Sequence, residues 1–519
     1  MSTMCDSEPG VLGNERALHT DTLAQSVAIL LLMTIVQRLL GFGRGVLVCR
    51  WLDAEQLGQW DVAYGFLLLA APLAVLGLPG SFGRYFEYFR QRKELRTFLR
   101  RTTLWSCGLG VGAIVGVLVC RSSVSQLVFG SAGQAELVVW LALALATVIL
   151  HNFLISLFIA ARIYRVVTGL QFSQTVLFAL LSVLLLNSWE MSAKSLVAAF
   201  GISSLVSALL MSKWIHQVWS SQAVTACVPQ RSFWGKLVPF ALWIWMTNIV
   251  ANLFELVDRY MLVHYSGLPV KQALEQVGNY HSSRVVPLLF AGIAALLSSV
   301  ATPHLSCDWE AGRRERVVDR LNLVLKLLAL ALFTASIATL LVGPYLFEIG
   351  FRGKFAGGLS VLPLTLTYCS WFGLSVVALN YLWCAERAGL STLALLAGLL
   401  TNIALNRLLL PRFGLEGAVW ATAAANLLAL ILVYQFSRLH GMRVHVGTWL
   451  VSLAPATLYL GILPAVGTWM AILLAGLMSR AVLDAQEKAQ LAAAFQQVMA
   501  HLFRRQRLRA NPSRYPKAV

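Results

Sequence analysis

The feature that most constrains this chain is a succession of long apolar segments, each close to the length of a membrane span and separated by short polar loops. A helix that crosses the hydrocarbon core of a bilayer needs about 20 mostly apolar residues. Fourteen such segments are predicted, at 22–49, 57–79, 102–120, 134–161, 164–187, 192–215, 237–263, 277–302, 320–343, 357–383, 388–409, 415–437, 446–463 and 464–483. The last two are short and meet at Pro464, so twelve spans is the alternative count.

The composition excludes the soluble classes of protein. Apolar residues make up 58% of the 519 and charged residues only 12%, whereas a soluble protein carries about 25% charged residues. Too few charges are present to cover the surfaces of several soluble domains, which excludes a cytosolic enzyme, a secreted disulfide scaffold and a disordered chain. Because the apolar segments are continuous rather than alternating, they favour helices over a barrel. The sequence therefore predicts an all-α, polytopic membrane protein with about 14 transmembrane helices.

The 41 Lys and Arg residues, set against 23 Asp and Glu, fall mostly in alternate loops. Basic loops stay on the cytoplasmic side, so both termini are predicted to be cytoplasmic, and the polar start of the chain shows no cleaved signal peptide. The predicted domains are a cytoplasmic N-terminal tail at 1–21, an N-lobe at 22–218, an inter-lobe cytoplasmic linker at 219–236, a C-lobe at 237–438, a C-terminal helix pair at 446–483, and a basic amphipathic cytoplasmic tail at 484–519.

Two basic segments with interleaved apolar residues are predicted to lie on the membrane surface. Residues 83–101 are expected to form an interfacial helix, and residues 485–509 place their apolar side chains on one helical face. A cytoplasmic loop beside a span meets anionic lipid first, so anionic membrane lipids are the expected partner and a nucleic acid is not. Docking of the second segment on a partner protein is the alternative.

The two halves of the chain carry similar segments. Arg44-Gly-Val-Leu-Val precedes Leu57-Gly58-Gln-Trp in the first half, and Arg259-Tyr-Met-Leu-Val precedes Val277-Gly278-Asn-Tyr in the second. Each copy lies between the first and second predicted spans of its half. This repeat predicts two six-helix lobes related by a pseudo-two-fold axis along the membrane normal, with a substrate site between them near the midplane.

Several motifs resemble one known family. They are Arg50-Trp-Leu-Asp-Ala-Glu-Gln-Leu-Gly-Gln-Trp, Leu76-Gly-Leu-Pro with Arg84-Tyr, Val257-Asp-Arg, Val277-Gly-Asn-Tyr, Phe351-Arg-Gly-Lys-Phe-Ala-Gly-Gly, Asn402-Ile-Ala-Leu-Asn and Pro411-Arg-Phe-Gly-Leu-Glu-Gly-Ala. In order and spacing they resemble the polysaccharide transporter family, the O-antigen flippase-like oligosaccharide-lipid flippases of the multidrug/oligosaccharidyl-lipid/polysaccharide exporter (MOP) superfamily. One departure is that the Tyr-Arg pair usual early in the eighth span reads Ser283-Arg284.

The resemblance implies two six-helix lobes around a central cavity, with a further helix pair at the C-terminus in some members. It implies a transporter of the bacterial inner membrane that moves a polyprenyl-pyrophosphate-linked oligosaccharide to the outer leaflet for surface polysaccharide synthesis. The expected partners are this lipid-linked glycan and the glycosyltransferases or polymerase of the same pathway.

Charged residues inside the predicted spans are the candidate site residues, because burying them in a membrane requires a partner or a water-filled cavity. Arg38 near the middle of the first span is a candidate cavity cation for the pyrophosphate, or else it pairs with a carboxylate or carbonyl of a neighbouring helix. The predicted substrate-binding set is Arg38, Arg44, Asn248, Asn252 and Arg284, and the predicted gating or coupling set is Glu255, Asp258, Arg259 and Lys326.

Three of these residues have simpler alternatives. Glu255 and Arg259 are four positions apart and can pair along one helical face. Lys326 begins the ninth span, from where its ammonium can snorkel to the cytoplasmic surface.

The predicted function is a lipid-linked-glycan flippase working by alternating access. The alternatives are an ion-coupled multidrug exporter of the same superfamily and a flippase for lipid-linked peptidoglycan precursors. The cationic content of the spans attracts a pyrophosphate and repels cationic drugs, which favours a flippase. An enzyme is not expected, since the chain has no metal-diphosphate motif and no phosphate-binding loop. No catalytic residue, cofactor or metal site is predicted, and the coupling ion is left open between H⁺ and Na⁺.

Overall fold

The computed structural model describes residues 23–220 and 230–479 and, beyond them, positions 482, 484, 485, 487–489 and 496. Helices make up these ranges, and no residue in them belongs to a strand. The α-helices are α1 Leu23–Trp51, α2 Ala54–Ala74, α3 Phe82–Gln91, α4 Leu95–Val119, α5 Arg121–Phe129, α6 Ala135–Ala160, α7 Tyr164–Ser188, α8 Ala193–Leu210, α9 Ser212–Ser220, α10 Gln230–Tyr265, α11 Val270–Arg284, α12 Pro287–Glu310, α13 Arg314–Tyr345, α14 Ala356–Cys384, α15 Ala388–Leu439, α16 Val446–Leu453 and α17 Ile462–Met478. Short 3-10 or π turns are η1 Leu78–Ser81, η2 Ala132–Gln134, η3 Leu346–Gly350 and η4 Ala454–Leu460.

Eleven helices within the described ranges are long and apolar enough to cross a membrane. One of them, α15, has 52 residues and leaves helical geometry at Gly414 (φ 54°, ψ −131°), so it contains the two spans predicted at 388–409 and 415–437. Two shorter apolar helices, Val446–Leu460 and Ile462–Met478, follow. The predicted all-α, polytopic membrane fold is therefore confirmed. The last two helices separate at Gly461 (φ 104°) rather than at the predicted Pro464.

Two local predictions are wrong. The eighth span, predicted as continuous over 277–302, consists of α11 and α12, which separate after Arg284 because Pro287 has no N–H to continue the helix. The basic segment 83–101 is not one helix, since the chain turns at Lys93 (φ 57°) between α3 and α4. A stacked Phe89–Phe98 pair, with ring centroids 4.9 Å apart, holds the two helices together across this turn.

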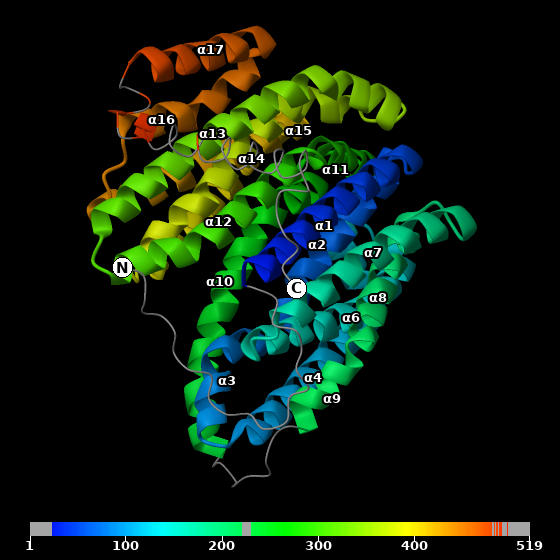
Figure 1. Ribbon diagram of the computed structural model, residues 1–519. Coiled ribbons are helices and arrows are strands. Elements are labelled where there is room, and N and C mark those ends of the chain that lie inside the picture. Colours follow the sequence, from blue (N-terminus) through cyan, green and yellow to red (C-terminus); the bar gives the residue numbers. More distant parts are fainter. Residues whose placement is uncertain are drawn as a thin grey trace, which may run out of the picture.

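The helices pack in two groups (Figure 1). Helices α1, α2, α4, α6, α7 and α8 contact one another in the first group, and α10 to α15 contact one another in the second. Helices α16 and α17 lie against α13, on the outside of the second group. These groups agree with the predicted N-lobe and C-lobe, and we use those names for them. The predicted lobe boundaries remain predictions; residues 1–21, 221–229 of the linker and most of 484–519 lie outside the described residues.

The lobes approach each other most closely where α2 crosses α11. A Cβ atom added to Gly58 would collide with the carbonyl oxygen of Leu274, and one added to Gly278 would collide with the carbonyl oxygen of Ala54. In both cases the carbonyl lies four residues before the glycine of its own helix. The crossing therefore has local two-fold symmetry, and it joins the two glycines that the sequence repeat had matched.

Contacts at the same end of the two lobes repeat this relationship. At the end of α1, Arg50 donates to the carbonyl of Ile349 in η3 (3.3 Å) and Lys354 donates to the carbonyls of Arg50 and Trp51 (3.0 and 3.2 Å). Near the end of α10, His264 Nε2 lies 2.8 Å from the carbonyl of Leu127 in α5. The first helix of each lobe is thus bonded to the end of the third membrane-spanning segment of the other lobe.

We expect Gly58→Ala and Gly278→Ala each to destabilise the protein by about 1–3 kcal/mol, because a methyl group would push the two backbones apart. The measurement is the thermal unfolding of the protein purified in detergent. Gly112→Ala is the matched control: it lies inside α4 with open space around its Cα, so alanine should leave stability equal or slightly higher. Equal melting temperatures for all three variants would contradict the proposed role of the crossing.

Candidate functional site

A buried ionic cluster lies between the lobes beside the glycine crossing. Asp61 of α2 contacts Arg259 of α10 (Oδ2 to Nε, 2.9 Å) and His281 of α11 (Oδ1 to Nδ1, 2.7 Å). Arg284, the last residue of α11, lies 3.9 Å away (Nη1 to Asp61 Oδ2). The exposed fractions of Asp61, Arg259 and Arg284 are 2%, 5% and 9%. We call these four residues the Asp61 centre; one carboxylate of the N-lobe here holds three nitrogen groups of the C-lobe.

The glycine crossing explains why these residues meet. Asp61 follows Gly58 by three residues and His281 follows Gly278 by three residues, so each side chain lies nearly one turn beyond the point where the backbones touch. Positions three apart share a helical face. Both side chains therefore point into the same space between α2 and α11, and their spacing depends on the absence of side chains at the two glycines.

The Asp61 centre contains more positive than negative charge. One carboxylate faces two guanidinium groups, and Arg259 Nη1 and Arg284 Nε have no hydrogen-bond partner among the described residues. The Arg284 guanidinium also lies over the ring of Tyr280, 5.3 Å from its centroid, which is a favourable cation–π position. Buried cationic donors without a partner are costly, so the centre has unused capacity to bind an anion.

A second polar cluster surrounds Asp258, the neighbour of Arg259 on α10. Its carboxylate accepts hydrogen bonds from Thr422 Oγ1 (2.6 Å), Asn406 Nδ2 (2.9 Å) and the Tyr280 hydroxyl (3.4 Å). Asn406 and Thr422 belong to the two parts of α15 on either side of the Gly414 kink. These three donors are all neutral, and the Oδ1 atom of Asn406 is buried without a hydrogen-bond partner among the described residues. Buried oxygens around an anionic carboxylate can hold a small cation or a proton.

Of the predicted gating set, Asp258 and Arg259 thus lie in these clusters, but Glu255 does not. The predicted Glu255–Arg259 pair along α10 is wrong, because Arg259 turns toward the N-lobe to reach the buried carboxylate of Asp61 and Glu255 is exposed. Adjacent residues of a helix point about 100° apart, which lets Asp258 face α15 while Arg259 faces α2.

The predicted substrate-binding residues lie in different environments. Arg284 belongs to the Asp61 centre, whereas Arg44 lies over the ring of Phe178 in α7, 4.0 Å from its centroid. Arg38 is exposed on α1 and lies beside α12 of the other lobe, where a Cβ at Gly292 would come within 3.0 Å of the Arg38 Nε. Asn248 and Asn252 on α10 are exposed and half-buried, and no contact joins them to the Asp61 centre within the described residues.

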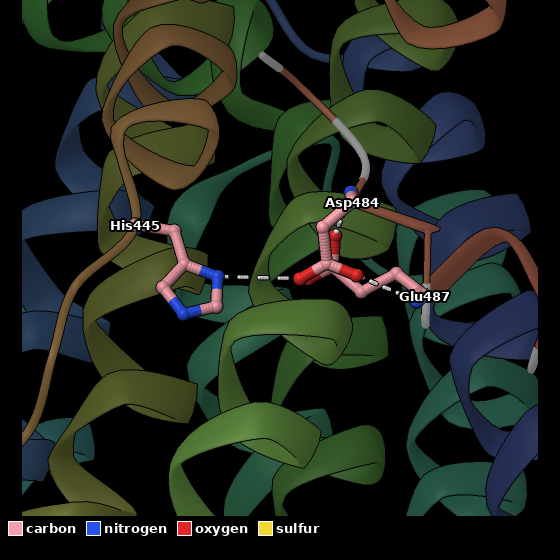
Figure 2. Close-up of side chains that lie close together, drawn as sticks. All are labelled: His445, Asp484 and Glu487. Carbon is pink, nitrogen blue, oxygen red and sulfur yellow. Dashed lines mark hydrogen bonds and ion pairs between the residues drawn. The ribbon is translucent and has the colours of Figure 1, made fainter. Parts of the chain in front are cut away.

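Lys326 lies in a separate cluster on the outer side of the C-lobe. Its ammonium donates to both carboxylate oxygens of Glu487 (2.7 Å each). His445 Nδ1 lies 3.8 Å from the same carboxylate (Figure 2). The predicted snorkelling of Lys326 is wrong, because its exposed fraction is 4% and a carboxylate of the C-terminal segment covers it.

Sequence reasoning did not select Asp61 or His281 as site residues. The repeat contains the missing signal, since both residues have the same offset from the matched glycines. Thr422 has no comparable signal, because it joins the Asp258 cluster only through packing of α15 against α10.

Comparison with known protein families identifies the family to which the chain belongs. The model of a family described as "Polysaccharide biosynthesis protein" matches residues 23–307, more than half of the sequence. The chain belongs to this polysaccharide biosynthesis protein family. The resemblance predicted from its motifs is therefore confirmed. No curated protein matches the chain.

Solved structures share the fold of this polysaccharide biosynthesis family member. A lipid II flippase MurJ in an inward closed conformation superposes with a TM-score of 0.66 at 14% identity, covering 86% of this chain and 98% of that one. An inward-facing multidrug resistance MATE family transporter of the MOP superfamily gives 0.59 at 15% identity, covering 78% and 94%. A MOP superfamily transporter from Pyrococcus furiosus, whose binding pocket is described as having reverse polarity, gives 0.57 at 13% identity, covering 80% and 94%. At these identities the similarity establishes the fold.

We expect Asp61→Asn to lower the free energy of unfolding by about 3–5 kcal/mol, because it leaves buried guanidinium groups without a counter-charge. Combining it with Arg259→Gln should cost less than the sum of the two single changes. The measurement is thermal unfolding of the four proteins in one detergent.

The control is Glu136→Gln, which breaks a more exposed ion pair with Lys194 (2.8 Å) in the N-lobe and should cost less than about 1 kcal/mol. If Asp61→Asn unfolds at the temperature of Glu136→Gln, the Asp61 centre does not hold the lobes together.

Proposed function

We propose that the protein is a flippase that moves a polyprenyl-pyrophosphate-linked oligosaccharide from the cytoplasmic to the outer leaflet of the bacterial inner membrane. The observation that carries this proposal is the Asp61 centre, a buried carboxylate of one lobe bound to arginines of the other. Such a contact closes one end of the space between the lobes and must break for that end to open. In the predicted orientation, with both termini cytoplasmic, this end is the external one.

The chemistry of the centre suits a pyrophosphate. Guanidinium groups bind phosphate oxygens through short, charge-assisted hydrogen bonds. A pyrophosphate reaching Arg259 and Arg284 can replace the Asp61 carboxylate while the two arginines stay paired with an anion. Substrate binding would then weaken the contact between the lobes, which links arrival of the substrate to opening of the external side.

Arg38 is proposed to contact the substrate earlier. It lies two turns before Arg44 on α1, between the lobes and toward the predicted cytoplasmic side, and its side chain is exposed. A guanidinium group at this position can attract a pyrophosphate that enters from the inner leaflet. Family membership supports a role in polysaccharide biosynthesis, and glycosyltransferases or a polymerase of that process are the proposed protein partners.

A flippase for lipid-linked peptidoglycan precursors is the second candidate. It is favoured by the TM-score of 0.66 to a lipid II flippase, which is the highest among the three structures compared above. A multidrug exporter is less well supported, because the excess of guanidinium groups in the Asp61 centre would repel a cationic drug.

We propose that the Asp258 cluster is the coupling site. Its carboxylate lies among neutral partners, next to an Asn406 oxygen that has no hydrogen-bond partner in the described part of the chain. Tyr280 connects it to the α11 helix that carries Arg284. A proton or Na⁺ bound by Asp258 would cancel the negative charge beside Arg259. The balance of positive and negative charge around the Asp61 centre would then change. Coupling between the ion and the substrate then follows from electrostatics between two adjacent clusters.

We expect Arg38→Gln to lower the initial rate of glycan-lipid translocation by about tenfold or more, the scale set by losing one hydrogen bond to a charged group. The measurement uses proteoliposomes containing a polyprenyl-pyrophosphate oligosaccharide whose sugar becomes accessible to a lectin on the outer side. Arg121→Gln, an exposed change at the start of α5, is the control and should retain the wild-type rate. A wild-type rate for Arg38→Gln would remove this residue from the transport path.

We expect Asp258→Asn to abolish the acceleration of transport by an imposed Na⁺ or H⁺ gradient while the gradient-free rate persists. Asparagine retains the size of the side chain, removes its charge and replaces one acceptor oxygen with an NH2 donor. The same liposomes, energised with each gradient in turn, identify the ion that drives the wild-type protein. Glu255→Gln, which neutralises the exposed carboxylate three residues earlier, should respond as the wild type does. An Asp258→Asn variant that still responds fully would exclude the Asp258 cluster as the coupling site.

A further inference from the structure

A crevice of about 360 Å³ opens between α13 and α17, beside Lys326. Its walls are almost entirely apolar and include Leu327, Leu330, Ile472, Leu473 and Leu477. The polar groups at its edge come from Lys326 and from Lys488 of the C-terminal segment. Neither the Asp61 centre nor the Asp258 cluster contributes to it.

The two helices that form the crevice are antiparallel and are joined at one point. Trp469 Nε1 of α17 donates to Thr334 Oγ1 of α13 (2.8 Å), and eight residues away along both helices Leu477 and Lys326 line the crevice. Large apolar side chains of both helices are exposed beside it, with exposed fractions of 39% for Leu327 and 78% for Leu477. In a chain that spans the membrane, a crevice bordered by exposed apolar side chains of α13, a candidate membrane span, and of α17, a shorter apolar helix, is suited to contact the acyl chains of lipid.

The carboxylate of Glu487 occupies the polar end of the crevice. Two nitrogen groups of the C-lobe and the loop before α16 contact the Glu487 carboxylate. Lys326 Nζ donates to it, and His445 Nδ1 lies 3.8 Å from it (Figure 2). Glu487 arrives from the segment after α17, where its side chain accepts from the backbone N–H of Asp484 (2.9 Å) and Asp484 Oδ1 accepts from the N–H of Glu487 (2.7 Å). This reciprocal pair is a capping box that starts a helix.

A metal ion does not fit this cluster, although ligand atoms of His445, Asp484 and Glu487 lie within 4.8 Å of one another. Both oxygens of Glu487 contact the ammonium of Lys326, which would repel a cation at the same place. The capping box accounts for the closeness of Asp484 and Glu487 without an ion. The positive charge of Lys326 favours an anion at this position instead.

We propose that Lys326, His445 and the crevice form a binding site for an anionic phospholipid. The phosphate contacts Lys326 and one acyl chain occupies the crevice. Glu487 is a tethered competitor that holds the phosphate position when no lipid is bound. Exchanging one anion for the other keeps the buried ammonium of Lys326 paired, which avoids the cost of an isolated buried charge. Binding of the lipid therefore releases the segment around residues 484–489 from the C-lobe. This inference does not depend on the transported substrate.

The test is the affinity of the full chain for phosphatidylglycerol, measured by native mass spectrometry in a neutral detergent. Glu487→Gln should bind this lipid about tenfold more tightly, the scale of one hydrogen bond to a charged group, because glutamine can retain the capping box but lacks the competing charge. Adding Lys326→Gln should abolish the gain. Phosphatidylcholine with the same acyl chains should bind all variants alike, and glycerol phosphate without acyl chains should not compete.

Lys271→Gln is the matched control, because Lys271 also lies near a carboxylate, Glu55 (3.8 Å), but far along the chain from the crevice. It should not alter lipid affinity. In the wild-type protein, phosphatidylglycerol should also increase tryptic cleavage after Lys488, whose ammonium is held by the carbonyls of Leu477 and Ser479 (3.0 and 2.9 Å). Equal phosphatidylglycerol affinity in the wild type and Glu487→Gln, or unchanged cleavage after Lys488, would overturn the proposal.

Discussion

The contact of α2 with α11 at Gly58 and Gly278 is the constraint on which the rest of the structure depends. Two helix backbones approach this closely only where neither carries a side chain. The approach brings α2 of the N-lobe into extensive contact with α11 of the C-lobe. It also determines which side chains of the next helical turn face the space between the two helices. Asp61 is one of them, and it contacts its partners there. Side-chain volume at two positions thus decides the geometry of an electrostatic contact.

Charge is distributed around this crossing so that each ionic group has a different neighbour. Arg259 and Asp258 are adjacent on α10 but have different kinds of partner. Arg259 forms an ion pair with Asp61 of the N-lobe, whereas Asp258 accepts hydrogen bonds from neutral side chains of the C-lobe. Lys326, another cation of the predicted spans of the C-lobe, pairs with a carboxylate supplied from outside the six-helix group. In a membrane a charge must find a partner nearby or be solvated.

The helical fold class, the apolar character of the helices and the repeat could be predicted because they depend on local composition and on spacing along the chain. Helix breaks were less predictable. Pro287 ends a span that reads as continuous in the sequence, whereas the break predicted between 388–409 and 415–437 is present as the non-helical backbone of Gly414 inside α15. Such positions depend on whether neighbouring helices supply enough packing to continue a helix past a residue that disfavours it.

The sequence by itself determined that this chain crosses a membrane many times, that its halves are related, and that a small number of cations must lie inside it. Hydrophobic length and charge count are properties of the residues alone. Only the tertiary structure decided which carboxylate each cation contacts: Asp61 rather than Glu255 for Arg259, and Glu487 for Lys326. The physical reason is that ion pairing falls off steeply with distance, and the distance between residues far apart in the chain is set by how closely the helix backbones can pack.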